Sequence, residues 1–451
     1  MSNIPKHTLE FLDSWLAMRQ KWADIPGFVV AISHKGKTIF KKAYGFADFN
    51  DKVPMAPDHV FRIASHSKTF TATAIMQLQE KGKLRIDDLV VDYLPWLKEH
   101  SDARWSEVTI RQLLSHSAGI IRDGTNSNYW QLENEFPDID ELKNQILSSQ
   151  LLVEPNSKMK YSNFGYSLLG QIIESISGVS YGEYVTEHII DELGLRAMSP
   201  DMDAKLKYVT AHSRLRMNGG HYVLPNVATN AMAAATGFSA DAESLLRYFE
   251  AQMVGTGKLL TDVSKKEMQR QQWTVENASV KSSYGLGLEH AKYSGLPMIG
   301  HGGGFPGTST LSMFSAEREL VVVVLANTNA PVGSILGSAV EIIKEMGEKE
   351  PAEKFKKFEV RYSTLWGTFE VVATQHGLKG AWSNGWYPLS ETDSLEIHDD
   401  TTLKVTKTDG FSSFAESIVY EFDDAGRVLS VIDTGAKYKP STDGDVVVSW
   451  N

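Results

Sequence analysis

The chain has 451 residues, of which 42% are hydrophobic and 22% charged, so it can bury a large core, and its length favours two or three domains of roughly 150 residues. Its formal net charge is −11, and no stripe of Lys and Arg is interleaved with aromatic residues, which argues against nucleic acid as a partner. The absence of cysteine excludes disulfides, Cys-ligated metals and thiol catalysis.

The N-terminal segment lacks the apolar core of a signal peptide and enters a helical pattern at residues 9–16. We therefore expect a cytoplasmic protein, although an export signal already removed would leave the same sequence. The longest apolar runs, such as 320–325, are far below the roughly 18 residues of a membrane span, so none is expected.

The first strong pattern along the chain is a hairpin. Residues 27–33 and 37–44 read as strands, and Gly36 between them suits a tight turn. From Ser65 to Gly82 the spacing of apolar residues becomes helical, and helices and loops dominate up to about residue 275. The clearest of these helices are predicted at 164–176 and 181–193.

Strand patterns return at 284–290, 308–315 and 319–327, and a helix is predicted at 333–346. Strands at both ends with helices between them favour an α/β (α+β) domain, in which an antiparallel sheet carries an inserted helical subdomain.

The segment 348–357 is charged and contains proline, which is typical of a linker. Short strand-like runs separated by turn residues follow it, and they predict a small all-β barrel or sandwich. The expected domains are therefore 1–347 and 358–451. The predicted strands of the second domain are 366–372, 395–398, 403–405, 418–422, 428–432 and 446–450.

Ser65 and Lys68 form a Ser-x-x-Lys motif at the start of a predicted helix, a spacing that places both side chains on one helical face. A serine becomes a nucleophile when an adjacent base takes its proton, and a lysine of lowered pKa can serve as that base. The motif alone is weak evidence, because Ser157 and Lys160 have the same spacing.

Two further motifs add weight. Tyr161 and Asn163 form a Tyr-x-Asn motif in the loop before the helix at 164–176, where both side chains can face a cleft. His301 opens a His-Gly-Gly-Gly run, with Gly303 and Gly304 at its end, between two predicted strands. Its backbone can form one wall of the same cleft, since glycines allow close approach.

In this order, the three motifs resemble the signature motifs of the serine β-lactamase and penicillin-binding-protein superfamily. Within it, the match is to the branch of class C β-lactamases, D-specific peptidases and related esterases. The resemblance covers about residues 25–345, and the trailing β domain looks like the accessory C-terminal domain of some members. Segments 63–72, 108–119, 191–195 and 284–288 are also similar to family segments.

The resemblance implies roles for these residues. Ser65 would be the nucleophile, and Lys68 and Tyr161 would share the acid and base work, with no basis in the sequence for ranking them. Asn163 would hold Lys68 and a substrate carbonyl. His301 stands where β-lactamases usually have Lys, whereas several peptidases and esterases have His at this position. The N–H groups of Ser65 and Gly304 would bind the oxyanion.

The expected function is therefore a serine hydrolase that cleaves an amide or ester bond, in a D-residue-containing peptide or a short-chain ester, through an acyl-enzyme. The alternatives are a non-catalytic penicillin-binding or sensor protein of the same fold, and a true β-lactamase. This chemistry requires no cofactor or metal. The expected partners are a small-molecule or short-peptide substrate and, for oligomer formation, further copies of the chain.

A rival motif surrounds Ser180, which lies in the Gly-x-Ser-x-Gly pattern of α/β-hydrolases. That pattern requires a preceding strand, whereas the residues before Ser180 have a helical period. Ser180 is instead predicted to cap the next helix with Glu183. His116 is interpreted as structural, and His34 as a turn residue.

Overall fold

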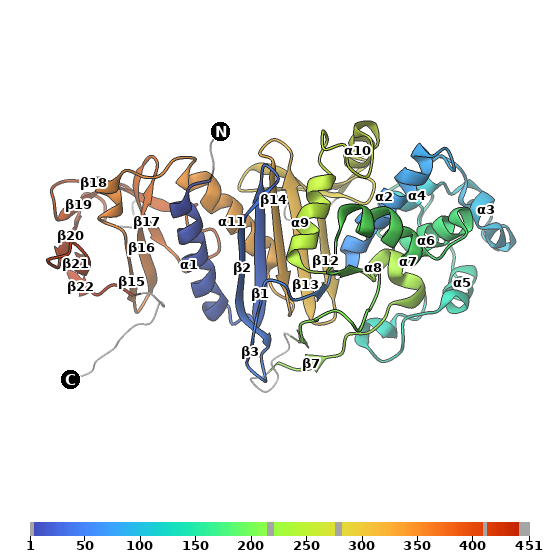
Figure 1. Ribbon diagram of the computed structural model, residues 1–451, viewed down its shortest axis with the longest axis horizontal. Helices are drawn as coiled ribbons and strands as arrows, with labels where there is room; N and C mark the ends of the chain where they lie inside the picture. The colour runs from blue at the N-terminus through green and yellow to red at the C-terminus, as the bar shows by residue number, and fades with distance from the viewer. Residues whose placement is uncertain (1–3, 214–220, 276–281, 409–412, 442–451) are drawn as a thin grey trace. The chain divides into compact units, whose positions relative to one another are not determined.

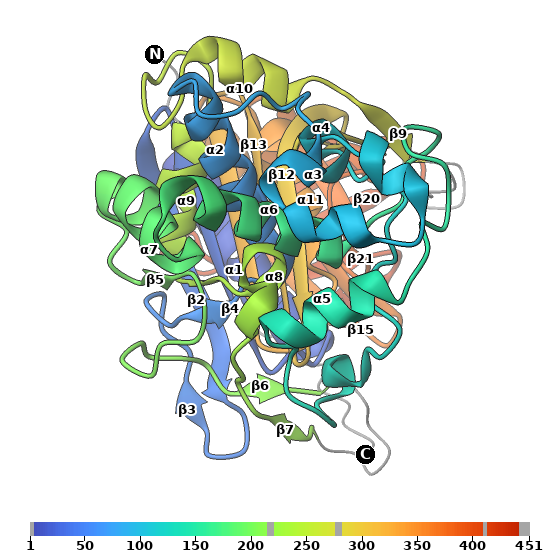
Figure 2. The ribbon, with the colours of Figure 1, turned by 90° about the vertical axis from the view of Figure 1, so that its right-hand side faces the viewer.

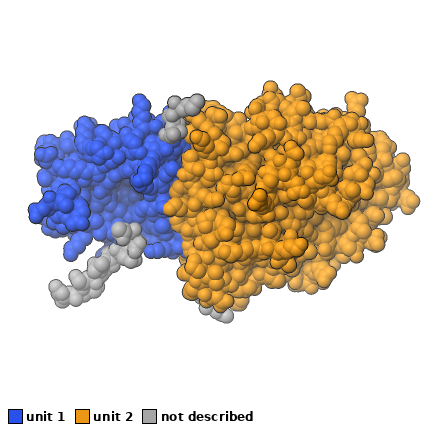
Figure 3. All heavy atoms as spheres, viewed as in Figure 1, with its two compact units in different colours: residues 1–23, 333–451 blue, residues 24–332 orange. Residues whose placement is uncertain are grey.

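The computed structural model describes residues 4–213, 221–275, 282–408 and 413–441. The chain divides into two compact units (Figure 3). Residues 24–332, orange and keyed as unit 2 in the figure, are called the first unit here, and residues 1–23 with 333–451, blue and keyed as unit 1, are called the second unit. The domain boundary expected at 348–357 stays a prediction, and a one-turn helix, α12 (Glu353–Lys356), lies within that segment.

The first unit contains a nine-stranded sheet in which every neighbouring pair is antiparallel (Figure 1). Its central strands β1 and β14 are almost wholly buried, which explains their continuous apolar sequences. In sheet order the strands are β3 (Val53–Pro54), β2 (Lys37–Asp48), β1 (Gly27–His34), β14 (Leu320–Ala326), β13 (Thr308–Ser315), β12 (Leu296–Phe305), β11 (Glu289–Tyr293), β10 (Ser282–Tyr284) and β9 (Trp273–Val275).

The helical part lies in the chain between β3 and β9. Helix α9 packs on β1, β13 and β14, while α2, α6 and α8 contact one another (Figure 2). The helices of this part are α2 (Ser67–Glu80), α3 (Val90–Tyr93), α4 (Ile110–Leu114), α5 (Ile139–Leu147), α6 (Asn163–Ser177), α7 (Tyr181–Val185), α8 (Ala233–Thr236), α9 (Ala242–Ala251) and α10 (Asp262–Gln269).

Short strands and single helical turns connect these helices. The strands are β4 (Phe61–Arg62), β5 (Met198–Ser199), β6 (Ala211–His212), β7 (Val223–Leu224) and β8 (Ser239–Ala240), and the turns are η1 (Ala64–His66), η2 (Pro95–Glu99), η3 (Ala103–Glu107), η4 (Asn128–Gln131), η5 (Thr186–Asp191) and η6 (Asn230–Met232).

The second unit combines α1 (Lys6–Trp22) with a nearly closed antiparallel barrel of eight strands in chain order. The N–H of Ser441 donates to the carbonyl of Arg361 at 2.7 Å, which brings the last described residues against the first strand. The strands are β15 (Val360–Thr364), β16 (Gly367–Thr374), β17 (Gly377–Trp382), β18 (Thr392–Ile397), β19 (Thr402–Lys407), β20 (Ser417–Phe422), β21 (Val428–Asp433) and β22 (Ala436–Tyr438).

The predicted fold class is confirmed: an antiparallel sheet with a helical insertion, followed by a β-barrel. The predicted helix at 333–346 is α11 (Val332–Met346). The strand expected at 284–290 is two strands, β10 and β11, because the chain turns at Gly287, whose φ is +75°. The helix expected at 181–193 changes to a wider π-helical turn at Thr186. The strand expected at 446–450 lies outside the described residues.

Within the described ranges, no helix is both long and apolar enough for a membrane crossing.

Candidate active site

Ser65 lies in η1, the tight turn that leads into α2. The preceding residue, Ala64, has a φ of +46°, a conformation that is strained for a residue with a Cβ. Two polar atoms meet the serine: Lys68 Nζ lies 3.1 Å from Ser65 Oγ, and the Tyr161 hydroxyl donates to it at 2.9 Å. The structure therefore brings together the three residues that the sequence marks for nucleophilic chemistry.

Lys68 is fully buried and its amine has three oxygen neighbours. Besides Ser65, Nζ bonds Asn163 Oδ1 at 2.7 Å and the carbonyl of Ala235 at 2.8 Å. Burial holds the pKa of Lys68 well below its usual value; the Asp123 carboxylate opposes this shift, and Arg122 adds to it. A neutral amine has two N–H groups, which Asn163 and Ala235 can accept, so its lone pair is left for the Ser65 proton.

Tyr161 and Asn163 are positioned by the start of α6. The side chain of Ser162 caps this helix by accepting the N–H of Gly165 at 3.0 Å. Burial raises the pKa of the Tyr161 phenol above its ordinary value, and the hydrogen bond to Ser65 offsets only part of that shift. Tyr161 is therefore a neutral phenol, able to donate a proton.

Asn163 has a second partner that the sequence did not suggest. Its Nδ2 donates to Asp123 Oδ1 at 2.6 Å, so the amide links this carboxylate to Lys68. Asp123 also lies 3.1 Å from Arg122 Nε. The amide end that we expected to meet a substrate carbonyl thus already has a protein partner.

His301 faces Tyr284 rather than Tyr161. Its Nδ1 donates to the carbonyl of Gly302 at 2.6 Å, which leaves Nε2 to accept from the Tyr284 hydroxyl at 3.1 Å. Burial, and after it the charge of Lys68, lower the pKa of His301 to about 3, so the ring is neutral. His301 therefore brings no positive charge to the cleft.

The run of glycines forms the end of β12, beside Ser65. A Cβ on Gly303 would lie 2.1 Å from the carbonyl oxygen of Ile63, so only glycine lets the strand approach this closely. The pairing of β11 with β12 ends at Gly300. Beyond it, the Gly302 N–H points away from β13 to the Glu289 carboxylate. Because N–H groups alternate along a strand, the Gly304 N–H faces the same free edge.

His116 packs beside Tyr161, with ring centroids 4.1 Å apart, and its Nδ1 accepts the N–H of Ser162 at 3.2 Å. These contacts agree with a structural role. Sequence reasoning missed Asp123 and Glu289, which no local motif identifies. It gave Tyr284 no role, although this residue opens the family-like segment 284–288. No group of three or more His, Asp or Glu suited to a metal ion occurs in the described part of the chain.

The competing motifs belong to other elements of the fold. Ser180 caps α7 in a reciprocal capping box with Glu183, as predicted, and α6 rather than a strand precedes it. Ser157 is exposed, with its hydroxyl bonded to the carbonyl of Glu154. His34 ends β1, before a turn in which Lys35 and Gly36 have positive φ.

Comparison with curated proteins gives relatives of two kinds. Protein flp of Staphylococcus aureus (strain MW2) is 33% identical over 172 residues, which are 38% of this chain and 34% of that protein. This chain thus matches about one third of the length of Protein flp. Penicillin-binding protein 4* of Bacillus subtilis (strain 168) is 27% identical over 357 residues, covering 73% of this chain and 75% of that protein.

Solved structures share the fold. An octameric penicillin-binding protein homologue from Pyrococcus abyssi superposes with a TM-score of 0.66 at 22% identity, over 95% of this chain and 99% of that one. A D-stereospecific amidohydrolase from Streptomyces sp. superposes with a TM-score of 0.61 at 26% identity, over 72% of this chain and 95% of that one.

The family match covers the whole of the first unit. Residues 15–339 match the Beta-lactamase family, and this range contains the three motifs around Ser65, Tyr161 and His301. The predicted membership is confirmed: the chain belongs to the Beta-lactamase family and has the fold of its serine hydrolases.

Proposed function

We propose that the protein is a serine hydrolase that cleaves an amide or ester bond through an acyl-enzyme on Ser65. One observation carries this proposal: Ser65 Oγ lies within hydrogen-bond distance of both an amine of lowered pKa, Lys68, and a phenol of raised pKa, Tyr161. These two opposite shifts rank the groups, with Lys68 as the base and Tyr161 as the acid.

In the acylation step, Ser65 Oγ attacks the substrate carbonyl carbon while its proton passes to Lys68. The negative charge that develops on the carbonyl oxygen is stabilised by the N–H groups of Ser65 and Gly304. The bond to the leaving group then breaks, and Tyr161 donates its proton to the departing nitrogen or oxygen. The proton held by Lys68 then passes to the Tyr161 phenolate, whose ring centroid lies 4.8 Å from Lys68 Nζ, so both groups return to their neutral forms.

In the second step, water attacks the ester of Ser65. Its proton passes through Tyr161 and Lys68 to Ser65 Oγ as the ester bond breaks, so the free acid leaves and the resting enzyme is restored.

The substrate class we propose is a D-residue-containing peptide or amide, or a short-chain ester. The similarity to a D-stereospecific amidohydrolase supports the first of these. A homo-oligomer is proposed on the fold shared with an octameric homologue, and sedimentation velocity would test it.

The test is hydrolysis of p-nitrophenyl acetate and D-alanine p-nitroanilide by the wild type, Ser65→Ala and Tyr161→Phe. We expect continuous turnover that Ser65→Ala abolishes and Tyr161→Phe slows by about 10²-fold, the effect of losing one proton-transfer group. Tyr222→Phe, which removes a hydroxyl from a half-exposed ring, is the control and should have no effect. A burst of one equivalent without further turnover would contradict the proposal and indicate an acylating sensor.

A further inference from the structure

Glu289 places a carboxylate beside the site, and none of the steps above uses it. It is the first residue of β11 and pairs with Gly300, the last residue of β12 that β11 covers. Its side chain is 40% exposed, so a substrate can reach it. Burial of the carboxyl group raises its pKa to about 7, so Glu289 carries its negative charge above that pH.

This carboxylate lies beside His301. Glu289 Oε1 is 3.6 Å from His301 Nδ1, and the carboxylate accepts the N–H of Gly302. Since one carboxylate offers about four acceptor positions, most of its hydrogen-bonding capacity remains for a ligand.

A row of packed rings joins His301 to the proton donor, Tyr161. Ring centroids lie 4.1 Å apart for Tyr161 and His116, 4.9 Å for His116 and Tyr284, and 5.8 Å for Tyr284 and His301. Glu289 also acts electrostatically on both reacting groups, since its charge raises the pKa of Lys68 and that of Tyr161. A leaving group that takes its proton from Tyr161 therefore lies within reach of this charge.

Within the described part of the chain, the cation that acts on Glu289 is Lys68, and its lowered pKa leaves the amine neutral in the resting enzyme. His301 is buried and neutral as well, and Arg122 lies beside Asp123. A leaving group that carries a carboxylate would therefore meet a negative charge with no positive partner, whereas an ammonium group would meet its complement.

Resting on the proposed function, we infer that Glu289 makes the site select substrates whose leaving group is positively charged. It disfavours substrates whose leaving group carries a carboxylate. The preferred substrates are thus amides or esters of a D-residue with an amine-bearing leaving group. Peptides that end in a free carboxylate after the scissile bond, and β-lactams with their ring carboxylate, are disfavoured.

The test is made at about pH 8.5, above the pKa of Glu289, so that this carboxyl group is ionised. It uses three amides of N-acetyl-D-alanine whose leaving amines are ethylenediamine, glycinamide and glycine, and so differ mainly in charge. The kcat/KM of the wild type should fall in that order, by about fivefold per step, as for a partly exposed charge pair. Glu289→Gln should bring the three values within about twofold of one another. Glu317→Gln, an equal change of charge in the turn between β13 and β14, should keep the order.

Equilibrium binding of the same three compounds to Ser65→Ala, with and without Glu289→Gln, measures the charge preference in the absence of catalysis. The same order there supports the inference even if turnover fails, a failure that would count against the proposed function alone. An equal effect of Glu289→Gln on all three compounds in both measurements would overturn the inference and assign Glu289 to the support of His301.

Discussion

At the scale of single residues, the protonation of Lys68 depends on the charges around it. Burial lowers its pKa, Asp123 opposes that shift, and Arg122 adds to it. Asp123 is also joined to Lys68 by two hydrogen bonds, one on each side of the Asn163 amide. Asp123 is thus a positioning residue whose charge reaches the base through space.

Replacing Asp123 by Asn tests this role. Loss of the negative charge should lower the pKa of Lys68 further, and because the active form has a neutral Lys68, the acidic limb of the kcat/KM profile should move to lower pH. The plateau should fall by no more than about tenfold, the difference between a charge-assisted and a neutral hydrogen bond. Asp140→Asn on α5 is the matched control, and an acidic limb that stays in place would contradict the account.

The sequence predicted some of these residues and not others. Ser65, Lys68, Tyr161 and Asn163 stand in spaced motifs, so their identity and order marked them as candidates. Asp123 and Glu289 are single acidic residues in a chain that has 56, and only folding brings them to Lys68 and His301. No local pattern could have selected them.

At the scale of elements, β12 is the part of the site that depends most on glycine. Gly303 lies against the carbonyl of Ile63, where a Cβ would be 2.1 Å from the oxygen, while a Cβ on Gly304 would have no neighbour within 4 Å. The strand can therefore approach Ser65 only if the first of these two positions has no side chain.

These two glycines form a matched pair for substitution. Gly303→Ala should lower the free energy of unfolding by about 1–3 kcal/mol, because β12 must move away from η1. Gly304→Ala should change it by less than about 1 kcal/mol. Urea denaturation measures both, and equal effects would contradict the close approach.

The same glycines explain why β12 was not predicted as a strand. Glycine is a poor strand former, so residues 301–304 read as a connection, and pairing with β13 overrides that preference. The β1–β2 hairpin and β14 were predictable because turn residues or continuous apolar runs mark them. The barrel strands β15, β17 and β22 lack such signals.

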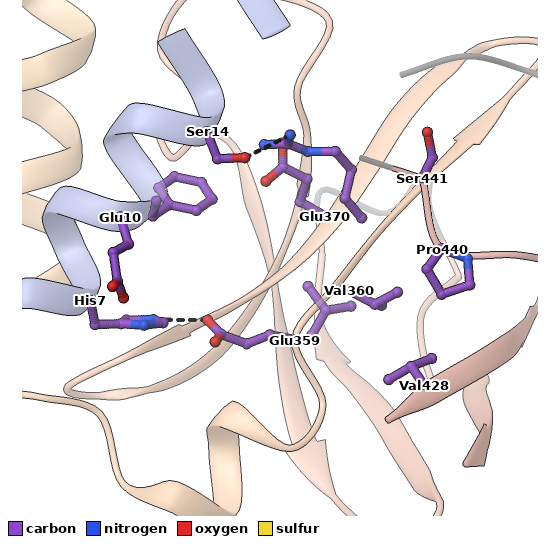
Figure 4. Close-up of a pocket in the computed structure, with 12 residues that line it drawn as sticks. His7, Glu10, Ser14, Glu359, Val360, Glu370, Val428, Pro440 and Ser441 are labelled. Atoms are coloured by element: carbon purple, nitrogen blue, oxygen red, sulfur yellow. Dashed lines mark hydrogen bonds and ion pairs between the residues drawn. The ribbon is translucent and has the colours of Figure 1, made fainter. Parts of the chain in front are cut away.

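At the scale of the whole molecule, each unit has its own core and its own polar contacts. Within the second unit, a cavity of about 540 Å³ lies between α1 and the barrel (Figure 4). Two contacts cross it: His7 Nε2 lies 2.9 Å from Glu359 Oε1, and Arg361 Nη1 donates to Ser14 Oγ at 2.9 Å. They join helix and barrel into one body.

The His7 contact should make the stability of this unit depend on pH. The hydrogen bond to Glu359 raises the pKa of His7 above its ordinary value of 6.5. The stability that this contact adds is therefore complete below pH 6.5 and is lost as the pH rises through the raised pKa. A double-mutant cycle of His7→Gln and Glu359→Gln, measured by urea denaturation, should give about 0.5–1 kcal/mol at pH 5.5 and none at pH 9. The same coupling at both pH values would contradict the prediction.

The intact mass of the protein after exposure to a fluorophosphonate identifies the nucleophile directly. We expect one adduct on the wild type, retained by Ser180→Ala and absent from Ser65→Ala. An adduct that persists in Ser65→Ala, or one that is lost in Ser180→Ala, would contradict the assignment of Ser65 as the nucleophile.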